Sequence, residues 1–151
     1  QIPTPPAIPD IIKNYVDTGK VKIVFMDLVF LGQDSVTAAL YNRSIWKLYP
    51  SQYFEWRTAM YVAQDEEGDQ GFGDATSIDK LNAKISGIDA AKVAADVEAN
   101  KAIYQAMLDS DKAEAQKVGI NSTPAFVIET EMIVGAYPYA KFQSVIDSFL
   151  K

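Results

Sequence analysis

The carboxylates are the side chains in this sequence most able to bind a cation or move a proton, and they are concentrated in one segment. Residues 65–74 combine three glycines with five acidic residues, which are Asp65, Glu66, Glu67, Asp69 and Asp74. Calcium prefers several carboxylate oxygens, but here the glycine comes one position late for an EF-hand loop, and Thr76 stands where the bidentate glutamate is needed. No sequence feature places one of these carboxylates in an apolar pocket that would raise its pKa for acid-base catalysis. We therefore predict that residues 65–74 form a solvated loop and not a metal site.

Cysteine and histidine, which carry much of the chemistry of enzymes, do not occur among the 151 residues. Disulfides, thiolate nucleophiles, imidazole bases and the most common zinc sites all require one or the other. We therefore expect no catalytic residue, no metal ligands and no cofactor in this chain. We also expect the chain by itself to be inactive in dithiol chemistry.

The step from Thr123 to Pro124 is a further feature with chemical consequences. An X–Pro bond is the only common site of a cis peptide bond, and a cis bond turns the chain sharply while leaving the backbone groups of the preceding residue free to face a groove. The alternative is an ordinary trans bond before a strand. Trans is the more frequent isomer and is favoured when the local sequence is considered alone.

Aromatic side chains are dense between residues 46 and 56. They could form a surface that binds peptides, because aromatic rings supply a large contact area at low entropic cost. They could also pack between helices and a sheet, and we favour this interpretation. The residues are Trp46, Tyr49, Tyr53, Phe54 and Trp56.

Apolar spacing and capping residues predict the elements that must position these groups. Four prolines predict an extended or irregular start over residues 1–9. A helix from Pro9 to Gly19 follows, and residues 21–28, which are dense in β-branched and aromatic side chains, predict a buried strand. Further helices are predicted over residues 34–48, 51–64, 76–86, 89–108 and 109–119.

The end of the sequence changes period. Two short apolar runs at residues 125–128 and 132–134 flank a polar triplet, which predicts a β-hairpin. Residues 139–150 return to helical spacing. No repeat or linker divides the chain, and a length of 151 residues suits one domain.

Composition excludes several kinds of partner. A net charge of −6 gives no clustered positive charge for nucleic acid. The apolar runs are far shorter than the roughly 20 residues that cross a bilayer, so we predict no membrane span. The N-terminal residues lack the pattern of a secretory signal, so either none was used or it has been removed.

Two segments of this sequence resemble the DsbA-like family of thioredoxin-fold thiol-disulfide oxidoreductases. Residues 15–39 contain YVDTGKVKIVF, then FLGQDS, and are similar to the second strand and first insert helix of that family. Residues 118–142 contain VGINSTPAFVI, then IVGA and Phe142, and resemble its cis-proline loop and closing hairpin. The resemblance implies an α/β, thioredoxin-like fold in one partial domain. Its expected parts are a helical insertion at about 34–119 and a C-terminal hairpin and helix at about 124–150.

The same resemblance implies a function. The parent protein is expected to form or isomerise disulfide bonds in an extracytoplasmic location, periplasmic or secreted. It also implies a cis bond before Pro124 and a groove at Ser122, Thr123 and Pro124 that binds an extended peptide or unfolded protein by strand addition. The alternative is a non-catalytic, redox-inactive module that keeps this groove for peptides.

The sequence departs from the family at its redox centre. The Cys-x-x-Cys motif, whose thiol pKa is lowered by a helix N-terminus, has no counterpart, and neither has the central strand before it. That strand would lie between residues 21–28 and 125–128, and its loss would leave a gap of roughly 9–10 Å. Three explanations are open: an incomplete or cleaved chain, which we favour, a strand donated by a partner chain, or a rearranged fold.

Overall fold

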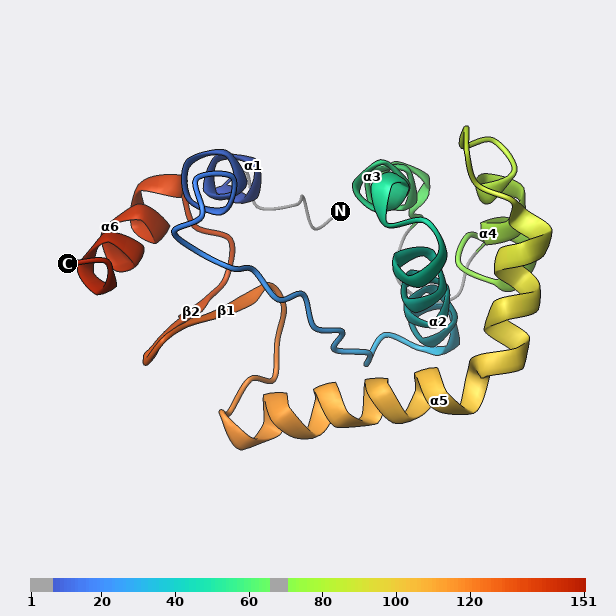
Figure 1. Cartoon of the computed structure of the whole chain (residues 1–151). Helices are drawn as coiled ribbons and strands as arrows, with labels where there is room; N and C mark the ends of the chain where they lie inside the picture. The colour runs from blue at the N-terminus through green and yellow to red at the C-terminus, as the bar shows by residue number, and fades with distance from the viewer. Residues whose placement is uncertain (1–6, 66–70) are drawn as a thin grey trace. The chain divides into compact units, whose positions relative to one another are not determined.

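The chain folds into two compact units. The computed structural model describes residues 7–65 and 71–151 (Figure 1). The helical unit is Asp27–Ala113, and the sheet unit combines residues 7–26 with Glu114–Lys151. The chain therefore passes from one unit to the other twice, after Met26 and after Ala113. The boundaries predicted for the helical insertion, and the interpretation of the chain as a single domain, stay predictions.

Helices build the helical unit. They are α2 (Gln33–Leu48), a 3₁₀ turn (Pro50–Gln52), α3 (Tyr53–Ala63), α4 (Ala75–Asn82) and most of α5 (Ala90–Lys117). Pro50 ends α2 because the residue before a proline is excluded from helical geometry, and Tyr49 has φ −138° and ψ 55°. Asp74 caps α4 by accepting a 2.7 Å hydrogen bond from the amide of Ser77. These local signals are the ones that the sequence carries, and the predicted helices of this region up to residue 86 are confirmed in position.

The core of the helical unit is formed where α2, α4 and α5 meet. Ile45, Ile78, Val93 and Leu108 are completely buried there. Burial at this level stabilises the fold by roughly 1.5–3 kcal/mol for each large apolar side chain. The apolar core of this unit is therefore formed by residues of the unit itself.

One predicted helix boundary is wrong. Residues 90–117 form the single helix α5, with no break before Ser110. Asp109 does not cap a new helix, because its carboxylate accepts a 3.0 Å bond from Gln105 one turn earlier. Tyr104 and Leu108 are buried just before this point, and Asp111 just after it is paired with Arg43 of α2. A capping residue ends a helix only where the chain can leave it, and here tertiary contacts lie on both sides of Asp109.

The strand predicted at residues 21–28 is also not formed. In the part of the chain that the structure describes, the sheet consists of β1 (Ala125–Ile128) and β2 (Glu131–Val134), and residues 21–28 pair with neither. Their side chains still alternate, with Val21 and Ile23 packed on the core of the sheet unit and Lys22 exposed. The segment has the pattern of a strand but not the hydrogen-bonded neighbour that makes one.

The sheet unit packs one face of its hairpin against helices. β1 and β2 are antiparallel, with Phe126 opposite Ile133 and Ile128 opposite Glu131. Glu129, with φ 52°, forms the two-residue turn that the polar triplet predicts. Ile133 joins the core with Phe142 of α6 (Tyr139–Phe149). The predicted hairpin and final helix are confirmed.

The first helix begins earlier than predicted. α1 (Ala7–Ile11) continues into a π-helical turn (Ile12–Val16), so residues 7–9 are not extended. Pro9 fits the first turn of α1, where its missing amide has no helical acceptor to lose. Gly19 ends the segment with φ 74°, as expected for a C-terminal glycine. Residues 1–6, which share the predicted irregular start, lie outside the described residues.

Candidate functional site

The loop between α5 and β1 carries the residues predicted to bind substrate. Ser122 and Pro124 are half-buried and Thr123 is exposed. The peptide bond between Thr123 and Pro124 is cis, which is the isomer that the resemblance implies. The carbonyl of Pro124 accepts a 2.8 Å bond from the amide of Gly135, so the ladder with β2 starts at this residue. The loop thus leads directly into β1.

The register of the hairpin decides which backbone groups of β1 face outward. Hydrogen-bonded and non-hydrogen-bonded pairs alternate along an antiparallel ladder. Since Pro124 bonds to Gly135, the next residue to face β2 is Phe126. The N–H and C=O groups of Ala125 and Val127 therefore point away from β2. They form the edge at which the central strand expected between residues 21–28 and 125–128 would pair, so the backbone groups predicted to meet an extended peptide are those of Thr123, before the cis bond.

Core packing holds this edge in place. The ring of Phe126 lies edge-to-face against Phe142, with centroids 4.7 Å apart and planes at 74°. Ile128, on the same face of β1, packs on the same core. Val127 points to the opposite face and is half exposed. The loop that precedes β1 is therefore supported from one side by this packing.

The acidic loop is only partly described, since Glu66, Glu67 and Asp69 lie outside the described residues. Asp65 accepts a 2.9 Å bond from the amide of Phe72, and Asp74 caps α4. Among the residues that the structure does describe, no group of three or more acidic side chains is placed to hold a metal ion. The described carboxylates at both ends of the loop stabilise local backbone.

The Asp74 cap makes α4 sensitive to acid. The hydrogen bond from the Ser77 amide lowers the pKa of Asp74 below its ordinary value of 3.8. An acid with a lowered folded-state pKa stabilises the fold at neutral pH, and this contribution is lost as pH falls through that lowered pKa. We expect Asp74→Asn, which keeps the acceptor but not the charge, to remove this part of the acid dependence. NMR of the Ser77 amide from pH 6 to 2 measures it, and an Asp74→Asn titration that matches the wild type would contradict it.

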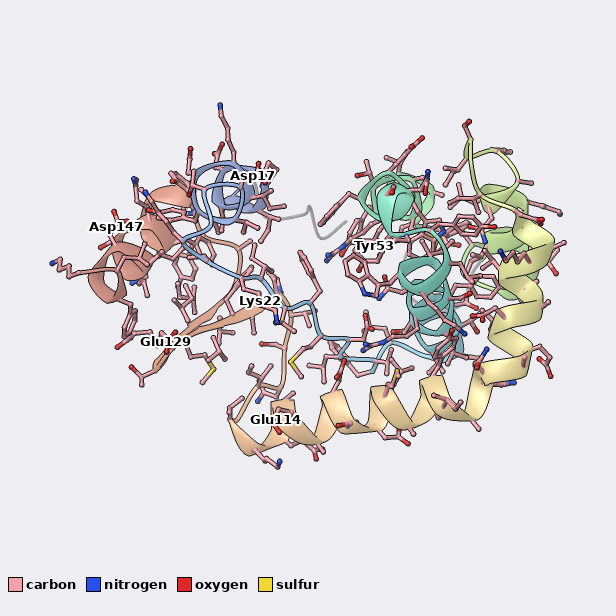
Figure 2. The ribbon with its side chains drawn as sticks, in the orientation of Figure 1. Asp17, Lys22, Tyr53, Glu114, Glu129 and Asp147 are labelled. Carbon is pink, nitrogen blue, oxygen red and sulfur yellow. The ribbon has the colours of Figure 1, made fainter. Side chains whose placement is uncertain are left out.

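The aromatic cluster divides into buried and exposed members. Tyr53, which is labelled in Figure 2, belongs to the helical unit. Tyr53 and Trp56 are both buried, as the packing interpretation predicts. Trp46 and Phe54 are 58% and 48% exposed, so for these two that interpretation is wrong. Both exposed rings lie edge-on to Tyr53, at centroid distances of 5.0 Å and 5.3 Å. They extend the core packing of Tyr53 to the surface.

A polar hollow on the sheet unit has no counterpart in the sequence analysis. Its lining is formed by Asn14, Tyr15, Lys20, Tyr139, Gln143 and Asp147. The Tyr15 hydroxyl donates a 2.6 Å bond to Oδ1 of Asp147, which is labelled on α6 in Figure 2. Burial and this bond raise the pKa of Tyr15, so the phenol stays protonated and acts as a fixed donor. The pair ties the π-helical turn to α6.

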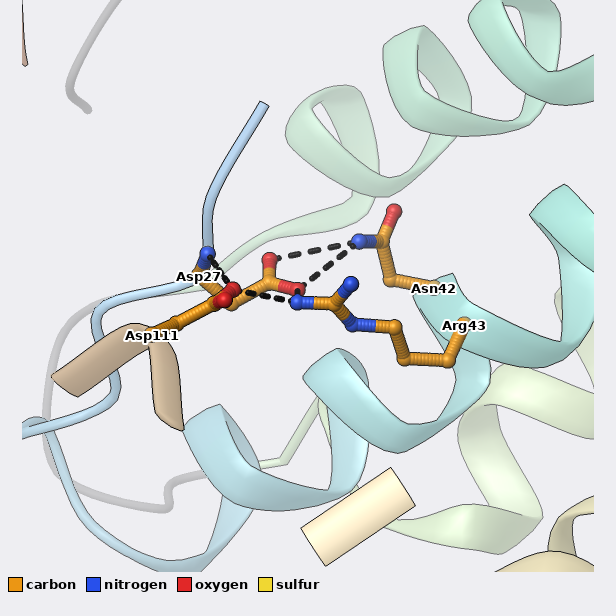
Figure 3. A network of polar contacts seen from close by, with 4 residues as sticks. All are labelled: Asp27, Asn42, Arg43 and Asp111. Carbon is orange, nitrogen blue, oxygen red and sulfur yellow. Dashed lines mark hydrogen bonds and ion pairs between the residues drawn. The ribbon is translucent and has the colours of Figure 1, made fainter. Parts of the chain in front are cut away.

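A second polar cluster, also missed, lies in the helical unit. Arg43 of α2 forms ion pairs with Asp27, at 3.0 Å, and with Asp111 of α5 (Figure 3). Asn42 donates to both carboxylate oxygens of Asp27 at 3.2 Å. Burial raises the pKa of Asp27, and the Arg43 guanidinium opposes this. Up to 84 positions separate these residues in the sequence, so no local pattern could have found them.

Comparison with known proteins identifies the family to which this chain belongs. Residues 6–148 match the family model described as Thioredoxin. The chain is 23% identical over 145 residues to disulfide bond formation protein D of Bacillus subtilis, covering 95% of this chain and 63% of that protein. Its identity to the probable protein of that name from Bacillus anthracis is also 23%, covering 95% and 64%. The chain thus spans slightly less than two thirds of these relatives.

Solved structures agree on the fold. The oxidised crystal structure of BdbD from Bacillus subtilis superposes with a TM-score of 0.79 at 22% identity, covering 95% of this chain and 76% of that one. The thiol-disulfide exchange protein α-DsbA2 of Wolbachia pipientis gives a TM-score of 0.76 at 25% identity, covering 95% and 73%. No helix in the described residues is long and apolar enough to cross a membrane. This chain belongs to the thioredoxin family and has the thioredoxin-like fold of the DsbA-like oxidoreductases.

Proposed function

We propose that the parent protein of this chain is a DsbA-like thiol-disulfide oxidoreductase that forms or isomerises disulfide bonds in extracytoplasmic polypeptides. The family match over residues 6–148 and the relatives named as disulfide bond formation proteins support this activity. A similar structure from Salmonella enterica, described as a periplasmic thioredoxin-like protein, supports the location. Activity, substrates and partners are proposed for the whole protein, of which this chain supplies a part.

The contribution of this chain is to hold the substrate. The observation that carries this proposal is the cis bond before Pro124, which leaves the backbone groups of Thr123 in an exposed loop ahead of β1. Strand addition uses main-chain hydrogen bonds for affinity and therefore accepts many sequences. Such tolerance suits an enzyme that meets unfolded polypeptides of different composition.

Electron exchange must come from elsewhere in the parent protein. Dithiol exchange proceeds by thiolate attack on a disulfide sulfur, and these 151 residues contain no cysteine. The proposed thiolates therefore belong to a Cys-x-x-Cys segment that this sequence does not include. The coding DNA of the intact gene tests this: a Cys-x-x-Cys codon run upstream of residue 1 supports it, and a start codon directly before Gln1 contradicts it.

An activity assay distinguishes catalysis by the parent protein from substrate binding by this chain. We expect the parent protein to accelerate the reduction of insulin by dithiothreitol and the 151-residue chain to leave the rate unchanged. The chain should nevertheless bind a fluorescein-labelled, reduced and carboxymethylated polypeptide that stays unfolded, as followed by fluorescence anisotropy. Disulfide exchange by the chain alone would contradict the proposed division of labour.

Binding at the cis-proline loop can be tested with one proline. Thr123→Pro removes the amide donor of the residue before the cis bond, so we expect affinity for the labelled polypeptide to fall about tenfold. Met132→Pro is the control, because it removes an amide on β2 that faces the edge of the hairpin away from β1. Equal loss of affinity in both variants would show that the effect comes from a general loss of structure.

A second candidate is a redox-inactive peptide-binding module. The absence of cysteine is the observation that favours it. It predicts that the intact protein binds the labelled polypeptide but fails to accelerate insulin reduction, and that thiol-blocking reagents leave its binding unchanged. The oxidoreductase proposal predicts the opposite result for activity.

A further inference from the structure

The ion network of Arg43 lies where the chain enters and leaves the helical unit. Asp27 is the first residue of that unit, and Asp111 lies two positions before its last residue, Ala113. All four residues drawn in Figure 3 belong to the helical unit, and Asn42 and Arg43 come from α2. The network therefore brings together the two ends of one 87-residue stretch, Asp27–Ala113.

Direct bonds join the two ends. The backbone amide of Asp27 donates a 2.9 Å bond to Oδ2 of Asp111. Nη2 of Arg43 contacts that same oxygen, and it lies 3.0 Å from Oδ2 of Asp27. One guanidinium nitrogen thus lies between a carboxylate on each end of the stretch.

The charges make this arrangement depend on Arg43. Two carboxylates lie within reach of one nitrogen, and their side chains are only 24% and 16% exposed. Without the cation they would repel each other in a partly desolvated place, and removing one partner of a desolvated pair leaves an uncompensated charge. Arg57 also lowers the pKa of Asp27, so it is the other positive group acting on this site. Only Arg43, however, is paired with both carboxylates.

We propose that Arg43 acts as a clasp that holds the entry of the helical unit against α5, so that opening this one contact frees the link before Asp27. The exit at Ala113 lies inside α5, which runs unbroken to Lys117, so the network controls the entry link and not the exit.

Hydrogen exchange reads the clasp directly, because the Asp27 amide is one of its donors. In Arg43→Gln we expect the exchange rate of that amide to rise about tenfold or more, whereas the amides at residues 109–113 stay protected within α5. Lys47→Gln is the matched control: Lys47 lies one turn further along α2 and also pairs with α5, at 2.7 Å from Asp96, but away from Asp27. It should leave exchange of the Asp27 amide unchanged.

A second variant covers the case in which Arg43→Gln does not fold. Asp111→Asn keeps an acceptor for the Asp27 amide and removes one charge, so exchange of that amide should rise by a smaller factor. The proposal is overturned if a folded Arg43→Gln shows wild-type exchange of the Asp27 amide, or if Lys47→Gln has the same effect.

The effect of Arg43 on the freedom of movement between the two units is measured by a separate experiment. Because the chain has no cysteine, a pair introduced at Lys101 and Glu129, both exposed and one in each unit, can carry two labels without background. Single-molecule energy transfer should give a broader distance distribution in Arg43→Gln than in the wild type and in Lys47→Gln. Equal distributions in all three would overturn the role of the clasp in hinge freedom.

Discussion

Replacing Phe142 with alanine is expected to lower the free energy of unfolding of the sheet unit by about 3–5 kcal/mol. Phe142 is completely buried, and its ring packs edge-to-face on Phe126 of β1. Truncation removes the apolar contact and leaves a cavity beneath the strand, because a close-packed core collapses only partly. Urea unfolding followed by circular dichroism measures the change, which is large against the roughly 5–15 kcal/mol of a typical domain.

Phe149 provides the matched control on the same helix. Its side chain is 40% exposed, so Phe149→Ala should cost about 1 kcal/mol or less. Because Phe126 supports the loop that precedes β1, Phe142→Ala should also weaken binding of the unfolded polypeptide, whereas Phe149→Ala should not. Equal effects of the two alanine variants on unfolding would contradict the assignment of Phe142 to the core.

The second large effect is expected at a buried hydrogen bond in the helical unit. Trp56 donates from Nε1 to Oδ1 of Asn82 at 2.7 Å, with both side chains buried. Asn82→Leu keeps the approximate volume but leaves the indole N–H without an acceptor, which should cost about 1–3 kcal/mol. Tryptophan fluorescence during urea unfolding measures it.

A double-mutant cycle tests the cause of that loss. Trp56→Phe removes the donor, so the double variant Trp56→Phe with Asn82→Leu leaves neither group unpaired and should be less destabilised than the sum of the single variants. Trp46→Phe is the control for fluorescence, since Trp46 is exposed and contributes little to the core. Strict additivity would show that the hydrogen bond carries no stability of its own.

The loop at residues 122–124 was predicted in part from the sequence and in part depends on the tertiary structure. The Thr123–Pro124 step is visible in the sequence, and its resemblance to a family loop makes it a candidate for binding. Which groups of β1 face its open edge, however, depends on the register between β1 and β2, because a shift by one residue would turn the groups of Phe126 outward in place of those of Val127. The sequence predicts where the strands lie, but only their pairing decides which backbone groups face the open edge of each strand.

Local interactions were enough to predict several elements. The polar triplet around Glu129 and the helical spacing of Phe142 and Ile146 predict the hairpin and α6, because turn chemistry and apolar periodicity act over a few residues. The end of α2 follows from Pro50 for the same reason. Composition alone also determined that this chain has no thiolate or imidazole of its own.

The remaining features depend on contacts between distant residues. Residues 21–28 have the composition of a strand but need a hydrogen-bonded neighbour to become one, and α5 continues past Asp109, with Asp111 paired to Arg43 of α2. The network of Asp27, Arg43 and Asp111 joins residues up to 84 positions apart. Strand pairing and charge compensation arise only when such segments meet, so the tertiary structure alone decided them.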